Sequence, residues 1–271
     1  MQLNDVERVA SITRPEFVER FVRPGKPVII GNLADGWPAM KKWTPAYFKE
    51  RFGERRVMAV TTTKTGTDLV SHYGGHFETS MRELIDAVLE RNEDVRLGGR
   101  HTLDLALDLI DDFAWPDLGE GYTRRLLWLF FGAKGSRTPL HFDFGPFHVF
   151  HTSFLGKKTF HLFDQEQSHA LHRKPLTARS HVDTFHPDYD AFPRLKGARG
   201  WRATIDRGDT LYMPAGVWHD VTYHDPSIAL TLRFTEHAAF VATRVLFRLL
   251  LGTFNDVMER VAPKLWPRVR G

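Results

Sequence analysis

Two segments of the chain carry side chains that could together hold a metal ion. Residues 135–143 read GSRTPLHFD and end at His141 and Asp143, and residues 208–219 read GDTLYMPAGVWH and end at His219. Residues i and i+2 of a strand point to the same face, so His141 and Asp143 can both be directed at one point. Two imidazoles and one carboxylate on one side of an ion are the ligand set of non-haem Fe(II) centres, which leaves three coordination positions open. The spacing therefore predicts a metal site made by His141, Asp143 and His219.

The composition narrows the chemistry that such a site could use. The chain has 271 residues, no cysteine and 14 histidines. Disulfides, thiolate-bound zinc, iron–sulfur clusters and cysteine nucleophiles are therefore excluded, and any metal must be held by His, Asp or Glu. Hydrophobic residues make up 42% and charged residues 26% of the sequence, values typical of a folded protein with a sizeable core.

Charge and hydropathy give no indication of a nucleic-acid or membrane partner. The formal net charge is +4, which is too small to predict binding to nucleic acid. The N-terminal sequence MQLNDVERVA is polar and unlike a secretory signal. The longest apolar stretches, 126–131 and 245–251, are far shorter than the roughly 20 residues of a spanning helix. We therefore expect a cytoplasmic protein.

The second half of the chain has the pattern of a β protein. Short apolar or alternating runs follow one another and are separated by glycines and an Asp-Pro pair. These runs cover 126–131, 140–142, 149–155, 159–163, 201–205, 210–213, 221–223 and 228–234. Their spacing predicts an antiparallel barrel or sandwich that would carry both metal-binding segments. Residues 164–200, rich in His, Pro and Asp, are interpreted as a long functional loop rather than core.

Helical patterns flank these strands on both sides. Thr44 and Pro45 are typical of a helix start, and Ser80 with Glu83 forms a capping-box signal. The predicted helices cover 13–23, 44–52, 80–90 and about 238–262, and strands are predicted at 27–30 and 57–63. Residues 91–125 have little pattern. The sequence thus predicts a single domain with helical decoration.

The two metal-binding segments also match known sequence motifs. Residues 208–219 fit the second cupin motif, G-x5-P-x-G-x2-H, although Tyr223 stands where that motif closes with Asn. Residues 135–143 fit the start of the first cupin motif, with Asp143 in place of a second His. Together with RPGKPVIIGNLADGWPAMKKW, FLGKKTFHLF and SIALTLRF, these segments make the chain resemble the JmjC-type, cupin-like 2-oxoglutarate oxygenases.

The resemblance implies a mainly β fold with flanking helices. Its core would be a double-stranded β-helix, the cupin or jelly-roll arrangement, over about residues 126–236. This core would lie within an oxygenase domain of residues 1–236 that carries an N-terminal α/β decoration. A C-terminal helical extension, 237–271, would follow. Relatives often dimerise through their C-terminal helices, so a homodimer is expected.

The resemblance also implies the cofactor and the residues that bind it. Fe(II) would be bound by His141, Asp143 and His219, and the co-substrate 2-oxoglutarate by Lys158, Thr138 and Thr231. A dicarboxylate inside an apolar barrel needs a buried cation at its far end. Lys158 matches the lysine of the family, and Arg233, on the strand face of Thr231, is the alternative. His151 stands where several members have Asn, and its role stays open.

The implied activity is that of a 2-oxoglutarate-dependent dioxygenase, a hydroxylase that uses O2 and releases succinate and CO2. The expected substrate is a protein or peptide side chain, with a small molecule or an RNA base as alternatives. A catalytically silent, cupin-fold binding or regulatory protein is the competing interpretation. His148 and His161 are interpreted either as packed histidines or as parts of the site, and Trp128 and Trp218 as core residues.

Overall fold

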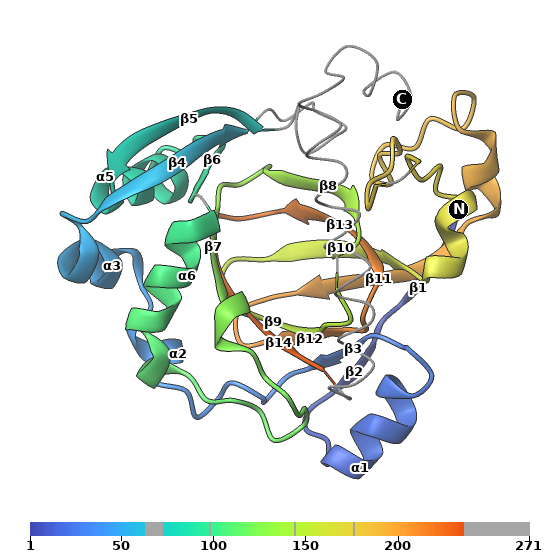
Figure 1. The fold of residues 1–271 in the computed structure, drawn as a ribbon, viewed down its shortest axis with the longest axis horizontal. Helices are drawn as coiled ribbons and strands as arrows, with labels where there is room; N and C mark the ends of the chain where they lie inside the picture. Colours follow the sequence, from blue (N-terminus) through green and yellow to red (C-terminus); the bar gives the residue numbers. More distant parts are fainter. Residues whose placement is uncertain (63–72, 98, 144, 176, 236–271) are drawn as a thin grey trace, which may run out of the picture.

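The core of the protein is a pair of facing β-sheets (Figure 1). The computed structural model describes residues 1–62, 73–97, 99–143, 145–175 and 177–235. Eight strands build the core: β7 (Trp128–Gly132), β8 (Arg137–His141), β9 (His148–Leu155), β10 (Lys158–Phe163), β11 (Arg199–Ile205), β12 (Thr210–Met213), β13 (Trp218–Tyr223) and β14 (Ser227–Phe234). They follow closely the runs predicted from the sequence.

The order of the strands is that of a jelly roll. One sheet runs β11-β10-β13-β8 and the other runs β12-β9-β14-β7, with antiparallel pairing throughout these eight strands. The first sheet is extended by β1 (Gln2–Asp5) and the second by β3 (Val28–Ile30) and β2 (Glu7–Val9). This order is typical of cupin-like double sheets, and the prediction of a mainly β core is confirmed.

Among the described residues, three apolar clusters hold the layers together. The first fills the space between the sheets and includes Phe160, Leu162 and Val221. The second packs the outer face of the β9–β14 sheet, through residues such as Phe150, against the N-terminal helices. The third packs the outer face of the β10–β13 sheet, around Trp218, against residues 164–200. Each sheet is thus covered on both faces.

The N-terminal part forms a shell of short helices and a small sheet. Its helices are α1 (Arg14–Phe17), continued by Val18–Val22, α2 (Ala39–Lys42), α3 (Pro45–Phe52), α5 (Met81–Ile85), continued by Asp86–Glu90, and α6 (Gly99–Asp108). The small sheet, ordered β5-β4-β6, consists of β4 (Arg56–Thr62), β5 (Tyr73–Ser80) and β6 (Val95–Leu97). In Figure 1 this sheet lies beside β7 and β8. Single helical turns occur at Ile110–Asp112, Arg124–Leu126, Gln165–His169 and Pro193–Gly197.

Residues 164–200 correct one prediction, because this segment contributes to the core. Leu171 and Leu195 are completely buried, and Val182 is 3% exposed. These side chains pack with Trp218 in the third apolar cluster. They are separated by ten residues or more in the sequence, so neither a helical nor a strand period indicates their burial. The segment is a folded cap on the sheet.

Some predictions fall on residues that the structure does not describe. The helix expected at about 238–262, and with it the homodimer contact, lies outside the described residues.

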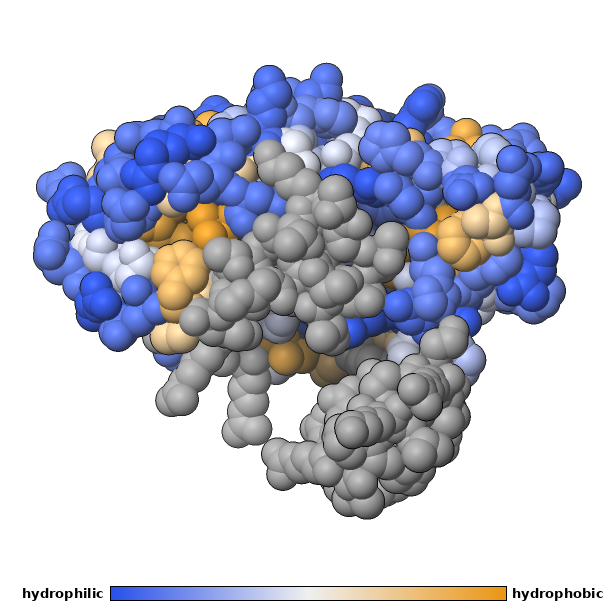
Figure 2. All heavy atoms as spheres, turned by 90° about the horizontal axis from the view of Figure 1, so that it is seen from above, coloured by the Kyte–Doolittle hydropathy of each residue, from blue (hydrophilic) through white to orange (hydrophobic). Residues whose placement is uncertain are grey.

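Within the part of the chain that is described, no helix is long and apolar enough to cross a membrane. The face drawn in Figure 2 is mainly hydrophilic, with apolar residues in small, separate patches.

The start of α3 provides a first testable prediction. The Thr44 hydroxyl accepts a hydrogen bond of 3.1 Å from the backbone N–H of Tyr47, and Pro45 occupies the first helical position. We expect Thr44→Ala to lower the free energy of unfolding by about 1 kcal/mol, since an N-cap acceptor is lost. Urea denaturation measures this change. Thr44→Ser keeps the acceptor and should be near wild type, and equal loss in both variants would contradict the prediction.

Candidate metal centre

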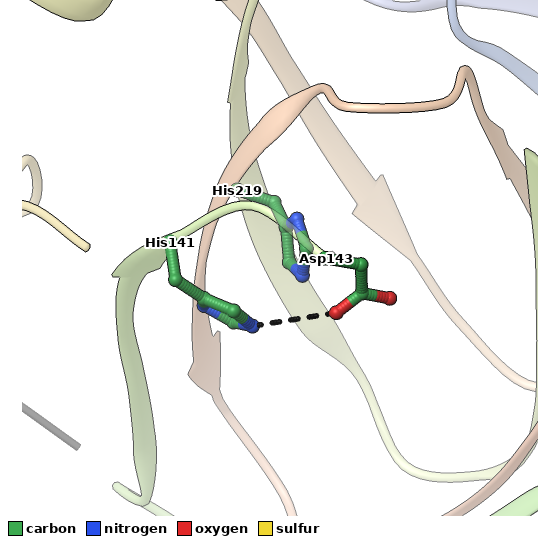
Figure 3. A group of neighbouring side chains, drawn as sticks. All are labelled: His141, Asp143 and His219. Carbon is green, nitrogen blue, oxygen red and sulfur yellow. Dashed lines mark ion pairs between the residues drawn. The ribbon is translucent and has the colours of Figure 1, made fainter. Parts of the chain in front are cut away.

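The structure brings His141, Asp143 and His219 together at one end of the space between the sheets (Figure 3). His141 is the last residue of β8, and it pairs directly with His219 of β13. The ring centroids of the two histidines are 4.2 Å apart. Asp143 lies just beyond the end of β8, with its Oδ1 3.9 Å from His141 Nε2. One ligand atom from each residue lies within 4.8 Å of the other two.

Backbone carbonyls orient both imidazoles. His141 Nδ1 lies 2.8 Å from the carbonyl oxygen of Pro139, and His219 Nδ1 lies 3.1 Å from that of Val217. An Nδ1–H that donates to a carbonyl leaves the Nε2 lone pair available for a metal. Burial, assisted by the neighbouring His219, lowers the pKa of His141 to about 3. This ring is therefore neutral at physiological pH, as a metal ligand must be.

Arg233 holds the carboxylate of Asp143 from the other side. Its Nη2 donates a 2.8 Å hydrogen bond to Asp143 Oδ2, while Oδ1 faces His141. Burial by itself would raise the pKa of Asp143, but the charge and the hydrogen bond of the Arg233 guanidinium hold it well below its usual range. Two imidazoles, each with its Nε2 free of a backbone contact, and one ionised carboxylate fit a divalent non-haem iron centre.

Arg233 is itself fixed by several contacts. Its Nη1 donates to the carbonyl of Leu126 at 3.1 Å and to the hydroxyl of Thr231 at 3.0 Å. Its guanidinium carbon lies 5.3 Å from the centre of the Trp128 ring. Trp128 is 37% exposed, so the prediction that it is a core residue is wrong. Thr231 is thus linked to the candidate metal centre through Arg233.

Lys158 lies deeper in the barrel and is completely buried. Its Nζ is 3.4 Å from His151 Nε2 and 4.7 Å from the centre of the Tyr223 ring. No carboxylate of the described residues lies within ion-pair distance of it. Burial, and then the charge of Arg96, lower the pKa of Lys158 to about 7. A buried ammonium group without an anion is costly, so this position is suited to an anionic ligand.

Thr138 is joined to a residue that the sequence did not single out. Thr138 pairs with Val221 of β13, and its hydroxyl accepts a 3.1 Å hydrogen bond from Arg96 Nη1. Arg96 belongs to β6, a strand of three residues in the stretch where the sequence shows little pattern. Arg96 and Thr138 are 42 residues apart in the sequence, so tertiary packing brings them together. No local signal could have identified it.

Of the remaining candidates, only His151 lies beside the site. It is 5% exposed, and burial together with Lys158 holds its pKa well below the usual range. His148 bonds to the hydroxyl of Tyr212, and His161 bonds to Thr184. Trp218 is completely buried in the third apolar cluster, as predicted.

The folded cap reaches the edge of the metal centre. The backbone N–H of Phe142 donates to the carbonyl of Ala178, and that of Ser180 donates to the carbonyl of Leu140. Arg179 forms an isolated bridge with His141. Residues 178–180 therefore pair with the end of β8 and flank one side of the metal centre.

The jelly roll and its centre of two histidines and one aspartate define a cupin-type protein with a candidate iron site. The chain belongs to the cupin-like domain family, whose sequence model matches residues 14–239. It is 26% identical over 223 residues to lysine-specific demethylase 8 of Xenopus tropicalis, covering 79% of this chain and 49% of that protein. It is also 26% identical over 243 residues to lysine-specific demethylase JMJ30 of Arabidopsis thaliana, covering 86% and 55%.

A third relative, HSPB1-associated protein 1 of Rattus norvegicus, is 25% identical over 295 residues and covers 96% of this chain. The chain spans about half of the length of the curated relatives it matches, between 49% and 60% in these three. The resemblance to JmjC-type, cupin-like oxygenases is confirmed over most of the chain. That family uses Fe(II) and 2-oxoglutarate, which agrees with the ligand set found here.

The contact between Arg233 and Asp143 leads to a second prediction. We expect Arg233→Met to weaken Fe(II) binding by about 10- to 100-fold, because a ligand-orienting hydrogen bond and a neutralising charge are lost. Anaerobic Fe(II) titration measures this change. Arg233→Lys keeps the charge and should recover part of the affinity. Unchanged affinity in Arg233→Met would show that the contact does not position the carboxylate.

Proposed function

We propose that the protein is an Fe(II)- and 2-oxoglutarate-dependent dioxygenase that hydroxylates a side chain of a protein or peptide. The observation that carries this proposal is the pairing of two features in one barrel. At one end, two oriented imidazoles and an ionised carboxylate converge. Further inside lies Lys158, a completely buried cation. A dicarboxylate that chelates the metal through one end could pair its second carboxylate with Lys158.

The strand register sets the separation of these two features. On β13, His219 and Tyr223 are opposite Leu162 and Lys158 of β10, with Val221 and Phe160 between them. Four residues at about 3.3 Å each place the backbone pair of His219 and Leu162 about 13 Å from the pair of Tyr223 and Lys158 along the strands. The Lys158 side chain can bridge part of this distance. The intervening side chains are apolar, so they exclude water from the space that the co-substrate would occupy.

Each residue then has a role in holding or positioning. His141, His219 and Asp143 would hold Fe(II), and Arg233 would keep Asp143 ionised and directed at the metal. Lys158 and Thr138 would bind the distal carboxylate of 2-oxoglutarate. When bound, iron and 2-oxoglutarate supply the oxidation of a C–H bond by O2, with release of succinate and CO2. The protein contributes orientation and a dry cavity.

The substrate class is the part of the proposal on which relatives bear most. Two of the relatives are named as lysine-specific demethylases, which favours a protein side chain over a small molecule or an RNA base. Hydroxylation of an N-methyl group gives a hemiaminal that releases formaldehyde, whereas hydroxylation of a side-chain carbon gives a stable alcohol. The same site could perform either reaction, and the product distinguishes them.

Anaerobic titration with Fe(II) and 2-oxoglutarate tests the proposal. We expect a weak visible metal-to-ligand charge-transfer band that requires both components, and in air a release of succinate that peptide substrates stimulate. Formaldehyde in the product would indicate demethylation. Binding of Fe(II) without 2-oxoglutarate would favour another cupin chemistry. No metal binding at all would leave the competing interpretation of a binding or regulatory protein.

A further inference from the structure

A second cation, Arg96, approaches the space in front of Lys158. Arg96 Nη1 donates to the hydroxyl of Thr138 at 3.1 Å. Both cations also lie on the ring of Tyr223, with Lys158 Nζ 4.7 Å and the Arg96 guanidinium carbon 5.9 Å from its centre. An ammonium, a guanidinium and a hydroxyl thus gather around one aromatic ring.

The position of Arg96 is set by the packing of the small sheet on the barrel. Its Nη2 donates to the backbone carbonyl of Arg137, so the guanidinium is anchored on β8. Close by, the hydroxyl of Ser136 donates to Asp94, which ties the chain before β6 to the start of β8. Because Thr138 pairs with Val221 of the interior cluster, its hydroxyl lies at the edge of the barrel interior. Arg96 therefore reaches the interior from outside the barrel.

Tyr223 forms the wall on which the two cations meet. Its strand position is directly opposite Lys158. Its ring packs against the backbone of Gly132, where a Cβ atom would lie 2.4 Å from a ring carbon. Gly132 thus leaves room for the ring, and the ring face is available to both cations, which favours their approach. Tyr223 is also the residue that departs from the closing Asn of the cupin motif.

We propose that Arg96 is a second binding residue for the distal carboxylate of 2-oxoglutarate, acting with Lys158 and Thr138. The positive charges of Arg96 and of the completely buried Lys158 repel each other, and an anion bound by both relieves this repulsion. A guanidinium forms charge-assisted hydrogen bonds in a fixed plane, whereas an ammonium acts as a point charge. The inference rests on the proposed function, and it implies strong selection for 2-oxo acids with a second carboxylate.

The test compares two 2-oxo acids that differ at the distal end. We expect Arg96→Met to weaken 2-oxoglutarate binding by about 10- to 100-fold, the effect of losing a charge-assisted hydrogen bond. Binding of 2-oxopentanoate, which has five carbons but no distal carboxylate, should be unchanged by the substitution. Dissociation constants are measured anaerobically from the charge-transfer band. Arg96→Lys should recover part of the loss, and Arg56→Met, on the exposed part of β4, is the matched control.

The outcomes separate this inference from the proposed function. Equal weakening of both acids by Arg96→Met would assign Arg96 a purely structural role on β8 and overturn the inference. Unchanged binding of 2-oxoglutarate would also overturn it, with the proposed function intact. A wild-type protein that binds Fe(II) but neither acid would overturn both. Fe(II) affinity, measured in every variant, reports whether the barrel is still folded.

Discussion

Replacement of Asp143 by alanine is expected to abolish turnover of 2-oxoglutarate and to weaken Fe(II) binding by more than about 100-fold. Residues that merely orient a ligand already contribute about 10- to 100-fold to metal affinity, so loss of a ligand costs more. Asp143 is also the only acidic group of the three-residue centre. Its removal leaves the Arg233 guanidinium, 8% exposed, beside the metal position without its partner. Repulsion of a divalent cation would then add to the loss.

Two further variants separate charge from geometry in this prediction. Asp143→Asn keeps an oxygen that can accept from Arg233 but removes the negative charge, so we expect it to bind Fe(II) weakly. The double variant Asp143→Ala with Arg233→Met removes the uncompensated cation and should bind Fe(II) better than Asp143→Ala alone. Anaerobic titration and succinate release are the measurements. Wild-type turnover in Asp143→Ala would contradict the assignment of the metal centre.

Both sheets contribute to the site, and this explains its rigidity. The first sheet supplies His141 and His219 from a directly paired position, and Lys158 from the adjacent strand. The second sheet supplies Arg233 and His151, which lie on paired strands and face the first sheet. Strand pairing fixes such positions better than a loop does. Asp143, just beyond β8, needs Arg233 to fix it for the same reason.

The strands could be predicted because their signal is local. Alternation and turn residues between 126 and 234 indicated each of the eight core strands. The capping signals at Thr44 and Ser80 are also confirmed, since both side chains accept the expected backbone hydrogen bonds. By contrast, β1, β2 and β6 are three or four residues long. All three lie at the edges of their sheets, and unlike the equally short β3 and β12 they lack a run of apolar residues that could indicate them.

The residues of the candidate site could also be predicted only in part from the sequence. Spacing and motif placed His141, Asp143 and His219 together, and the requirement for a buried cation indicated Lys158 or Arg233. The structure distinguishes these two by their partners, because Arg233 is bonded to Asp143 whereas Lys158 has no carboxylate within reach among the described residues. Arg96 could not be predicted, since its position depends on how the small sheet packs against β8.

Replacement of Lys158 by methionine is expected to weaken 2-oxoglutarate binding by about 100- to 1000-fold, because a buried charge pair with the distal carboxylate is lost. Fe(II) binding should stay near the wild-type value. Lys157→Met is the matched control, since Lys157 is the exposed neighbour on the same turn. Anaerobic titration with the charge-transfer band provides both constants. Equal effects of the two substitutions would contradict the assignment of Lys158.

The same substitution should stabilise the protein when no co-substrate is bound. The pKa of Lys158 is about 7 in the folded protein, against an ordinary value of 10.5. Between pH 7 and pH 10.5 the unfolded chain therefore binds more protons at this residue, and the contribution of Lys158 to stability becomes more favourable as the pH rises. Below pH 7 Lys158 is charged in both states, and the unfavourable free energy of burying its charge lowers the stability of the folded state in full. Methionine removes this cost and fills a similar volume.

Stability and binding are thus expected to change in opposite directions in Lys158→Met. Urea denaturation without 2-oxoglutarate should show a higher free energy of unfolding than wild type below pH 7, and a difference that shrinks towards pH 10. With Fe(II) already saturating, added 2-oxoglutarate should stabilise the wild type much more than the variant, since a ligand stabilises the folded state in proportion to how tightly it binds that state. A variant destabilised at every pH would instead show that Lys158 supports the fold. The burial of Lys158 would then give no indication of an anionic ligand, and the proposed binding site for the distal carboxylate of 2-oxoglutarate would lose its support.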